Sequence, residues 1–239
     1  MSDTGSSASI AITISTARGS IRGQWRPSSM TRAAAVLLPD AHNSLAGPSG
    51  LFNELAVAIQ RAGVCVLQLH RCSDDFEERR LALLAALDAV TRQGVDRMAL
   101  IGWHVGATMA IAAGSMHPTV RGVAALAPEA CAQPFMADLA PRSLLLMHGM
   151  NDRVTPASTS RMLFDRANDP KALIMYRGDG HKFAHHHEEA IATLTTWTHD
   201  LLRCPFKSRS FSRLSAAPTF SAALPLEHSD IPMMASSAK

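Results

Sequence analysis

The chain has 239 residues, of which 47% are hydrophobic and 18% charged, and its formal net charge is +3. This composition supports a hydrophobic core and excludes a collagen-like, disulfide-dense or wholly disordered chain. Aromatic residues make up 5% and the apolar runs are short. We therefore predict no nucleic-acid partner and no membrane partner. The four cysteines fit neither a zinc motif nor a disulfide framework, and the first residues do not resemble a signal peptide, which favours a cytoplasmic protein.

Two short strands are predicted first, over 9–15 and 20–26, because apolar and polar residues alternate there. From residue 33 onward, short apolar runs alternate with amphipathic segments. The predicted strands cover 33–38, 64–69, 97–103, 120–126, 143–147 and 171–176, and the predicted helices cover 51–62, 75–92, 105–116, 156–168 and 186–202. This alternation predicts an α/β fold, with a doubly wound, mostly parallel sheet and helices on both faces.

The composition changes after Arg203, where serine, alanine and proline become frequent and no apolar periodicity remains. We therefore predict a single domain over 1–204 and a disordered or loosely docked tail over 205–239. The sequence gives no indication of the oligomeric state.

The segment over 98–107 contains the most informative pattern, in which an apolar strand runs into two closely spaced glycines and then into a helix of small residues. Gly102 and Gly106 flank His104, which is the frame of a nucleophile elbow. The tight turn of an elbow lifts its central side chain above the sheet edge. It also directs the next amide, here that of Val105, toward a developing oxyanion.

Two later segments complete this pattern. Asp152 lies in HGMNDRV and His181 lies in YRGDGHK, and each segment follows a predicted strand. The order of elbow, acid and histidine is that of α/β-hydrolases. The stretch 33–203 resembles this fold, and most closely the dienelactone hydrolase-like branch, which has little or no cap. The resemblance implies that Asp152 is the acid and His181 the base, and we predict neither a cofactor nor a resident metal.

The chain departs from the family pattern at two places. His104 stands where the family has Ser, Cys or Asp, and Pro39-Asp40-Ala41 stands where the family usually has His-Gly. The amide of Ala41 is the second predicted donor to an oxyanion, together with that of Val105. The carboxylate of Asp40 lies beside it, and a negative charge there opposes an oxyanion.

Three interpretations of His104 remain open. In the first, an altered triad acts on a small ester or acyl substrate as an esterase, either with neutral imidazole as nucleophile or with water activated by His181. In the second, the protein is catalytically inactive and the fold serves as a binding protein. In the third, His104, His181 and Asp152 form a site of two histidines and one carboxylate for a metal ion.

We expect several further residues near these loops to have defined roles. Four of them are candidates for lining a substrate pocket, namely His42, Trp103, Cys131 and Met136. His148 lies at the end of a predicted strand, and we expect it to be a structural hydrogen-bonding group.

Overall fold

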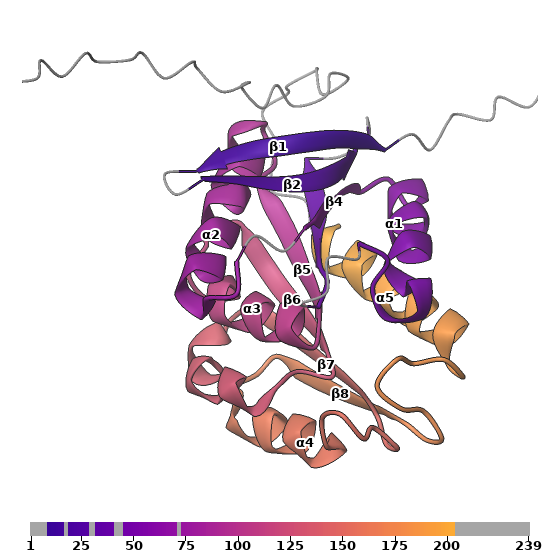
Figure 1. The fold of residues 1–239 in the computed structure, drawn as a ribbon. Coiled ribbons are helices and arrows are strands. Elements are labelled where there is room, and N and C mark those ends of the chain that lie inside the picture. Colours follow the sequence, from indigo (N-terminus) through magenta and orange to yellow (C-terminus); the bar gives the residue numbers. More distant parts are fainter. Residues whose placement is uncertain (1–8, 17–18, 29–31, 41–44, 71–72, 204–239) are drawn as a thin grey trace, which may run out of the picture.

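The computed structural model describes residues 9–16, 19–28, 32–40, 45–70 and 73–203. In these residues eight strands form one sheet in the order β1-β2-β4-β3-β5-β6-β7-β8 (Figure 1). The strands are β1 (Ile10–Thr16), β2 (Gly19–Arg26), β3 (Ala33–Leu38), β4 (Cys65–Leu69), β5 (Arg97–Trp103), β6 (Val120–Leu126), β7 (Ser143–Gly149) and β8 (Lys171–Tyr176). Strand β2 is antiparallel to both of its neighbours, β1 and β4. Every other neighbouring pair is parallel. The predicted fold class is confirmed.

Helices cover both faces of the sheet, as Figure 1 shows. One face packs against α2 (Phe76–Arg92), α3 (Val105–Gly114) and α4 (Ala157–Arg166), and the other packs against α1 (Leu51–Arg61) and α5 (His187–Leu202). Every residue of β3 and β4 is buried, as expected for apolar strands in the middle of a parallel sheet. Nine of the ten residues of α3 are buried, which its alanines and glycines allow because they have little or no side chain.

The predicted elements agree with the structure apart from a few ends and one loop. Strand β7 continues to Gly149, beyond the predicted end at 147. Between β6 and β7, where the sequence predicts neither a strand nor a full helix, the structure has two short 3-10 helices, η2 (Ala130–Phe135) and η3 (Ala137–Leu139). The predicted tail over 205–239 lies outside the described residues, and the proposed domain division stays a prediction.

The parallel strands place the candidate residues on one side of the molecule. The loops that follow β3, β5, β6, β7 and β8 all leave the sheet at its carboxyl edge, where ligand sites of open α/β sheets form. These loops contain Asp40, His104, Glu129, Asp152 and His181. Within the part of the chain that is described, no helix is both long and apolar enough to cross a membrane.

Candidate active site

The turn between β5 and α3 has the backbone of a nucleophile elbow. His104 has a φ of 52° and a ψ of −113°, and α3 begins at the next residue. A Cβ atom on Gly102 would lie 2.3 Å from the carbonyl oxygen of Gly106, and a Cβ atom on Gly106 would lie 2.1 Å from the carbonyl oxygen of Leu38. Both neighbours are backbone atoms, so the two positions require glycine, and they hold His104 in a conformation that L-residues rarely adopt.

The predicted acid and base lie in direct contact. Oδ2 of Asp152 is 2.7 Å from Nδ1 of His181, and Oδ1 accepts hydrogen bonds from the amides of Val154 (2.7 Å) and Thr155 (3.0 Å). Burial alone would raise the pKa of Asp152, but the hydrogen bonds from His181, Thr155 and Val154 outweigh it and lower that pKa. Asp152 is therefore an ionised carboxylate that fixes the hydrogen of His181 on Nδ1 and leaves Nε2 free to accept a proton.

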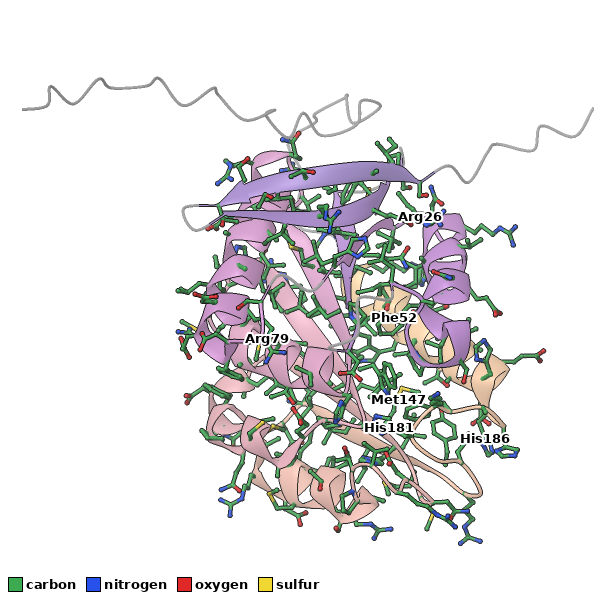
Figure 2. The ribbon with its side chains drawn as sticks, viewed as in Figure 1. Arg26, Phe52, Arg79, Met147, His181 and His186 are labelled. Carbon is green, nitrogen blue, oxygen red and sulfur yellow. The ribbon has the colours of Figure 1, made fainter. Side chains whose placement is uncertain are left out.

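The loop that carries His181 is anchored on both sides. The carboxylate of Asp179 is fully buried and accepts hydrogen bonds from the amides of His185 and His186, each at 2.9 Å. Trp103 donates its indole N–H to the carbonyl oxygen of His181 at 3.1 Å. Figure 2 shows His181 facing the interior of the site while His186 lies at the periphery. The loop of the base is thus held by the segment just before α5 and by the last residue of β5.

His104 lies between two carboxylates. Its Nδ1 is 3.2 Å from Oδ1 of Asp40, and its Nε2 is 3.7 Å from Oε1 of Glu129. The hydrogen bond that His104 donates to Asp40 raises the pKa of His104 against the opposing effect of burial, and the charges of Glu129 and Asp152 add to the rise. The rings of His104 and His181 meet at 84° with their centroids 4.8 Å apart. His104, Asp152 and His181 therefore converge, as each follows its own strand.

Glu129 is a residue of the site that the sequence analysis did not identify. It lies three residues after β6, and its backbone amide donates a hydrogen bond to Oγ1 of Thr108 at 3.2 Å. The available signal was its position, an acidic residue in a loop at the same carboxyl edge as the elbow. That signal does not reveal contact with His104, which depends on how the loop folds.

The other predicted site residues have different surroundings. Trp103 packs against His181 with a centroid distance of 5.2 Å. Cys131 is exposed, whereas Met136 is fully buried in the core on the α2–α3 side of the sheet. Ala41 and His42 lie outside the described residues. The roles proposed for these five residues in binding substrate or an oxyanion stay predictions.

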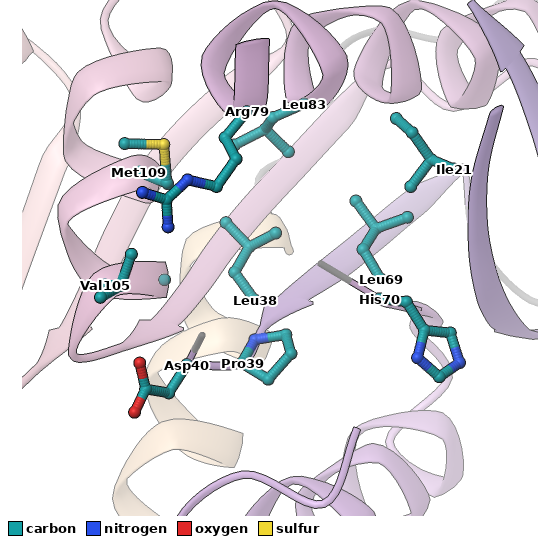
Figure 3. A pocket seen from close by; sticks show the side chains of 11 residues that line it. Ile21, Leu38, Pro39, Asp40, Leu69, His70, Arg79, Leu83, Val105 and Met109 are labelled. Atoms are coloured by element: carbon teal, nitrogen blue, oxygen red, sulfur yellow. The ribbon is translucent and has the colours of Figure 1, made fainter. Parts of the chain in front are cut away.

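A cavity adjoins the elbow, between α2, α3 and the ends of β3 and β4. Its volume is about 470 Å³, including space that is open to solvent. Figure 3 shows its mainly apolar lining, which includes Ile21, Leu38, Leu69, Leu83, Val105 and Met109. Arg79, His70 and Asp40 contribute the polar side chains. Asp40 borders both this cavity and His104, so the cavity and the elbow share one wall.

The described residues contain no group of three or more His, Cys, Asp or Glu side chains arranged to hold a metal ion. Nδ1 of His104 faces Asp40, and Nδ1 of His181 faces Asp152. The nitrogen atoms are thus engaged with separate carboxylates, and the interpretation as a metal site gains no support from this geometry.

Comparison with known proteins places the chain in a family. The sequence profile of the dienelactone hydrolase family matches residues 57–201. This match covers more than half of the chain and includes the elbow, the acid loop and the histidine loop. The chain belongs to the dienelactone hydrolase family. No curated protein sequence matches it.

Solved structures agree with this assignment at the level of the fold. Est1E from Butyrivibrio proteoclasticus superimposes with a TM-score of 0.71 at 12% identity, covering 81% of this chain and 99% of Est1E. Dienelactone hydrolase from Anabaena variabilis has a TM-score of 0.70 at 15% identity, with 82% and 97% coverage. An α/β serine hydrolase homologue from Coxiella burnetii has a TM-score of 0.65 at 16% identity, with 78% and 96% coverage. This member of the dienelactone hydrolase family thus has the α/β-hydrolase fold.

Proposed function

We propose that the protein hydrolyses small acyl esters by using two opposed histidine–carboxylate pairs. One pair is Asp152 and His181, and the other is Asp40 and His104. The observation that carries the proposal is the right-angled approach of the two imidazole rings at 4.8 Å, each with a carboxylate of its own on Nδ1. Membership of the dienelactone hydrolase family supports the reaction class.

In this proposal, His181 is the general base. Asp152 holds the Nδ1–H of His181 at 2.7 Å, so Nε2 accepts a proton from a water molecule placed between the ring and the substrate carbonyl. The oxygen of that water forms a bond to the carbonyl carbon, and its proton goes to His181. The tetrahedral oxyanion that results is stabilised by the amide of Val105.

His104 takes the role of the acid. Its raised pKa favours the imidazolium form, which has no lone pair with which to attack a carbonyl carbon. The carboxylates at both of its ring nitrogens therefore support protonation of the leaving alkoxide by His104 over nucleophilic attack by neutral imidazole. The tetrahedral intermediate collapses as the bond to the leaving oxygen breaks. The products are a carboxylic acid and an alcohol, and proton exchange with water restores both histidines.

The apolar lining of the cavity favours a substrate ester that carries an apolar group. Val105 lies at the cavity wall and also follows the elbow, so a substrate whose carbonyl reaches the Val105 amide can place an apolar group among the side chains of β3, β4 and α2.

Two ester series test the proposal. Nitrophenyl esters have a leaving group that departs without protonation, whereas alkyl esters of the same acyl chain need an acid. We expect His181→Gln to lower kcat/KM for both series by ~10²–10⁴-fold, which is the usual contribution of a general base. We expect His104→Gln to lower kcat/KM mainly for the alkyl esters. Equal losses in both series would instead indicate that His104 is the nucleophile.

A matched control and a negative outcome complete the test. His199→Gln changes an exposed histidine on α5 that pairs with Asp200, and it should leave both rates unchanged. If the folded parent protein gives no turnover above buffer with either series, the proposed hydrolysis is wrong. The interpretation as a non-catalytic binding protein would then replace it.

A further inference from the structure

A buried histidine that the proposed reaction does not use lies directly behind Asp152. His148 is the penultimate residue of β7, just before the loop that contains Asp152, and its side chain is fully buried. We propose that His148 is a positioning residue, which holds the carboxylate of Asp152 so that this carboxylate can orient His181. The inference rests on the function proposed for the Asp152–His181 pair.

The contacts of His148 connect three segments. Its Nε2 is 2.9 Å from the carbonyl oxygen of Thr155 and 3.2 Å from Oδ2 of Asp152. Its Nδ1 is 2.7 Å from Oγ of Ser160, a buried residue of α4. The ring therefore connects the end of β7 to both ends of the acid loop and to the helix that follows it.

These partners determine the tautomer of His148. Both oxygens beside Nε2 are acceptors only, so Nε2 carries a hydrogen. Burial lowers the pKa of His148 and keeps the ring neutral, so Nδ1 has a lone pair and accepts the hydroxyl hydrogen of Ser160. Both nitrogens of this buried ring thus have partners, as buried polar groups generally require.

The carboxylate of Asp152 is consequently fixed at both oxygens. Oδ1 is held by the amides of Val154 and Thr155. Oδ2 lies between the ring of His181 at 2.7 Å and that of His148 at 3.2 Å. The Nε2–H of His148 gives its hydrogen bond to the carbonyl oxygen of Thr155 and lies against Oδ2 as an electrostatic contact. Without His148, the only ring against Oδ2 would be the one that Oδ2 has to orient. Buried networks of this kind specify one geometry when all of their members are paired.

Two substitutions distinguish the hydrogen-bond donor of His148 from the space that its ring fills. His148→Leu removes the donor and fills similar space, whereas His148→Gln can place an amide N–H near the position of Nε2. We expect His148→Leu to lower kcat by ~10-fold or more with KM nearly unchanged, because the base acts on water and does not bind substrate. We expect His148→Gln to recover most of this loss.

A spectroscopic readout tests the same inference without catalysis. The ¹⁵N shifts of ring-labelled histidine report which nitrogen carries the hydrogen, and they are recorded at a pH that deprotonates histidine side chains. We expect the Nδ1–H tautomer of His181 to dominate in the parent protein and in His148→Gln. In His148→Leu we expect a mixture of the two tautomers. The signals of His181 are assigned by their absence in His181→Gln.

The outcomes distinguish this inference from the proposed function. An inactive parent in which His148→Leu still alters the His181 tautomer would overturn the proposed hydrolysis and support the positioning role. Unchanged kcat and tautomer in His148→Leu would overturn the positioning role, as would equal losses in the Leu and Gln variants. If His148→Leu does not fold, Ser160→Ala replaces it. This variant removes only the donor to Nδ1, and an unchanged His181 tautomer there would likewise overturn the inference.

Discussion

At the scale of single residues, the surroundings of His104 decide its chemistry. Its backbone is that of a nucleophile elbow, but its ring nitrogens face Asp40 and Glu129. Carboxylates at both nitrogens stabilise the protonated ring, because opposite charges favour the charged form of a titrating group. The same position in the fold therefore supports an acid here, where a hydroxyl or thiol would support a nucleophile.

The alkaline limit of activity should follow the protonation of His104. Asp40 raises the pKa of His104 above the ordinary value of 6.5, so the acid form persists to higher pH than in a free histidine. In Asp40→Asn this support is weakened, and we expect the alkaline limb of the kcat/KM profile for alkyl esters to move to lower pH. The measurement is kcat/KM across the neutral and mildly alkaline range. A limb that stays in place in Asp40→Asn would contradict the assignment of His104 as the acid.

A hydroxyl at position 104 should turn the elbow into a covalent site. We expect His104→Ser to react with a sulfonyl fluoride at residue 104 and to hydrolyse nitrophenyl esters faster than the parent protein, because His181 can then activate a side-chain nucleophile. Mass spectrometry of the labelled peptide locates the adduct. His104→Ala should not be labelled, and labelling of that variant would show that another residue reacts.

At the scale of elements, the elbow depends on a close approach between α3 and the end of β3. A Cβ atom on Gly106 would meet two backbone oxygens, those of Leu38 at 2.1 Å and Pro39 at 2.6 Å. Neither oxygen can move without shifting β3, the strand at the centre of the sheet order. The sequence pattern predicted this contact only indirectly, through the spacing of the two glycines.

Gly106→Ala should consequently destabilise the fold. We expect the free energy of unfolding to fall by about 3 kcal/mol, at the upper end of the usual cost of overpacking. Urea denaturation measures the change. Gly180→Ala is the matched control, because the nearest atom to its added Cβ is the carbonyl oxygen of Asn151 at 3.7 Å. Equal losses in the two variants would show that the close approach at Gly106 does not limit stability.

At the scale of the whole molecule, two buried carboxylates connect the loops of the site to the core. Burial raises the pKa values of Asp152 and Asp179, but hydrogen bonds outweigh it and both values are lowered in the folded protein. The stability that they contribute is complete above the unfolded carboxyl value of about 3.9. It is lost as the pH falls through the lower folded values.

The acid sensitivity of the fold should therefore depend on Asp179. We expect Asp179→Asn to lower the free energy of unfolding by about 1–3 kcal/mol at neutral pH, since the amides of His185 and His186 lose a charged, buried acceptor. The variant should also lose less stability than the parent protein as the pH is lowered below about 4. Urea midpoints at a series of pH values provide the measurement. Parallel pH curves for the two proteins would contradict this role.

The sequence was sufficient to predict the sheet, most helix ends and the convergence of His104, Asp152 and His181. Short continuous apolar runs mark β3 to β8, and the carboxyl-edge rule places the three loops together. The contacts of Glu129 with His104 and of His148 with Asp152 could not be predicted. Each depends on the fold of a loop and on the rotamer of a side chain, and neither leaves a periodic signal in the sequence.

In the elbow, the residues that fix the backbone conformation are not the residue that carries the reactive side chain. Its turn is fixed by two glycines and by the backbone of β3, and the side chain of His104 forms no capping hydrogen bond to α3. A substitution at position 104 consequently changes the reactive side chain, while the backbone turn that presents it stays the same. For protein engineering, residue 104 is therefore a position at which acidic, nucleophilic and unreactive side chains can be compared on the same backbone.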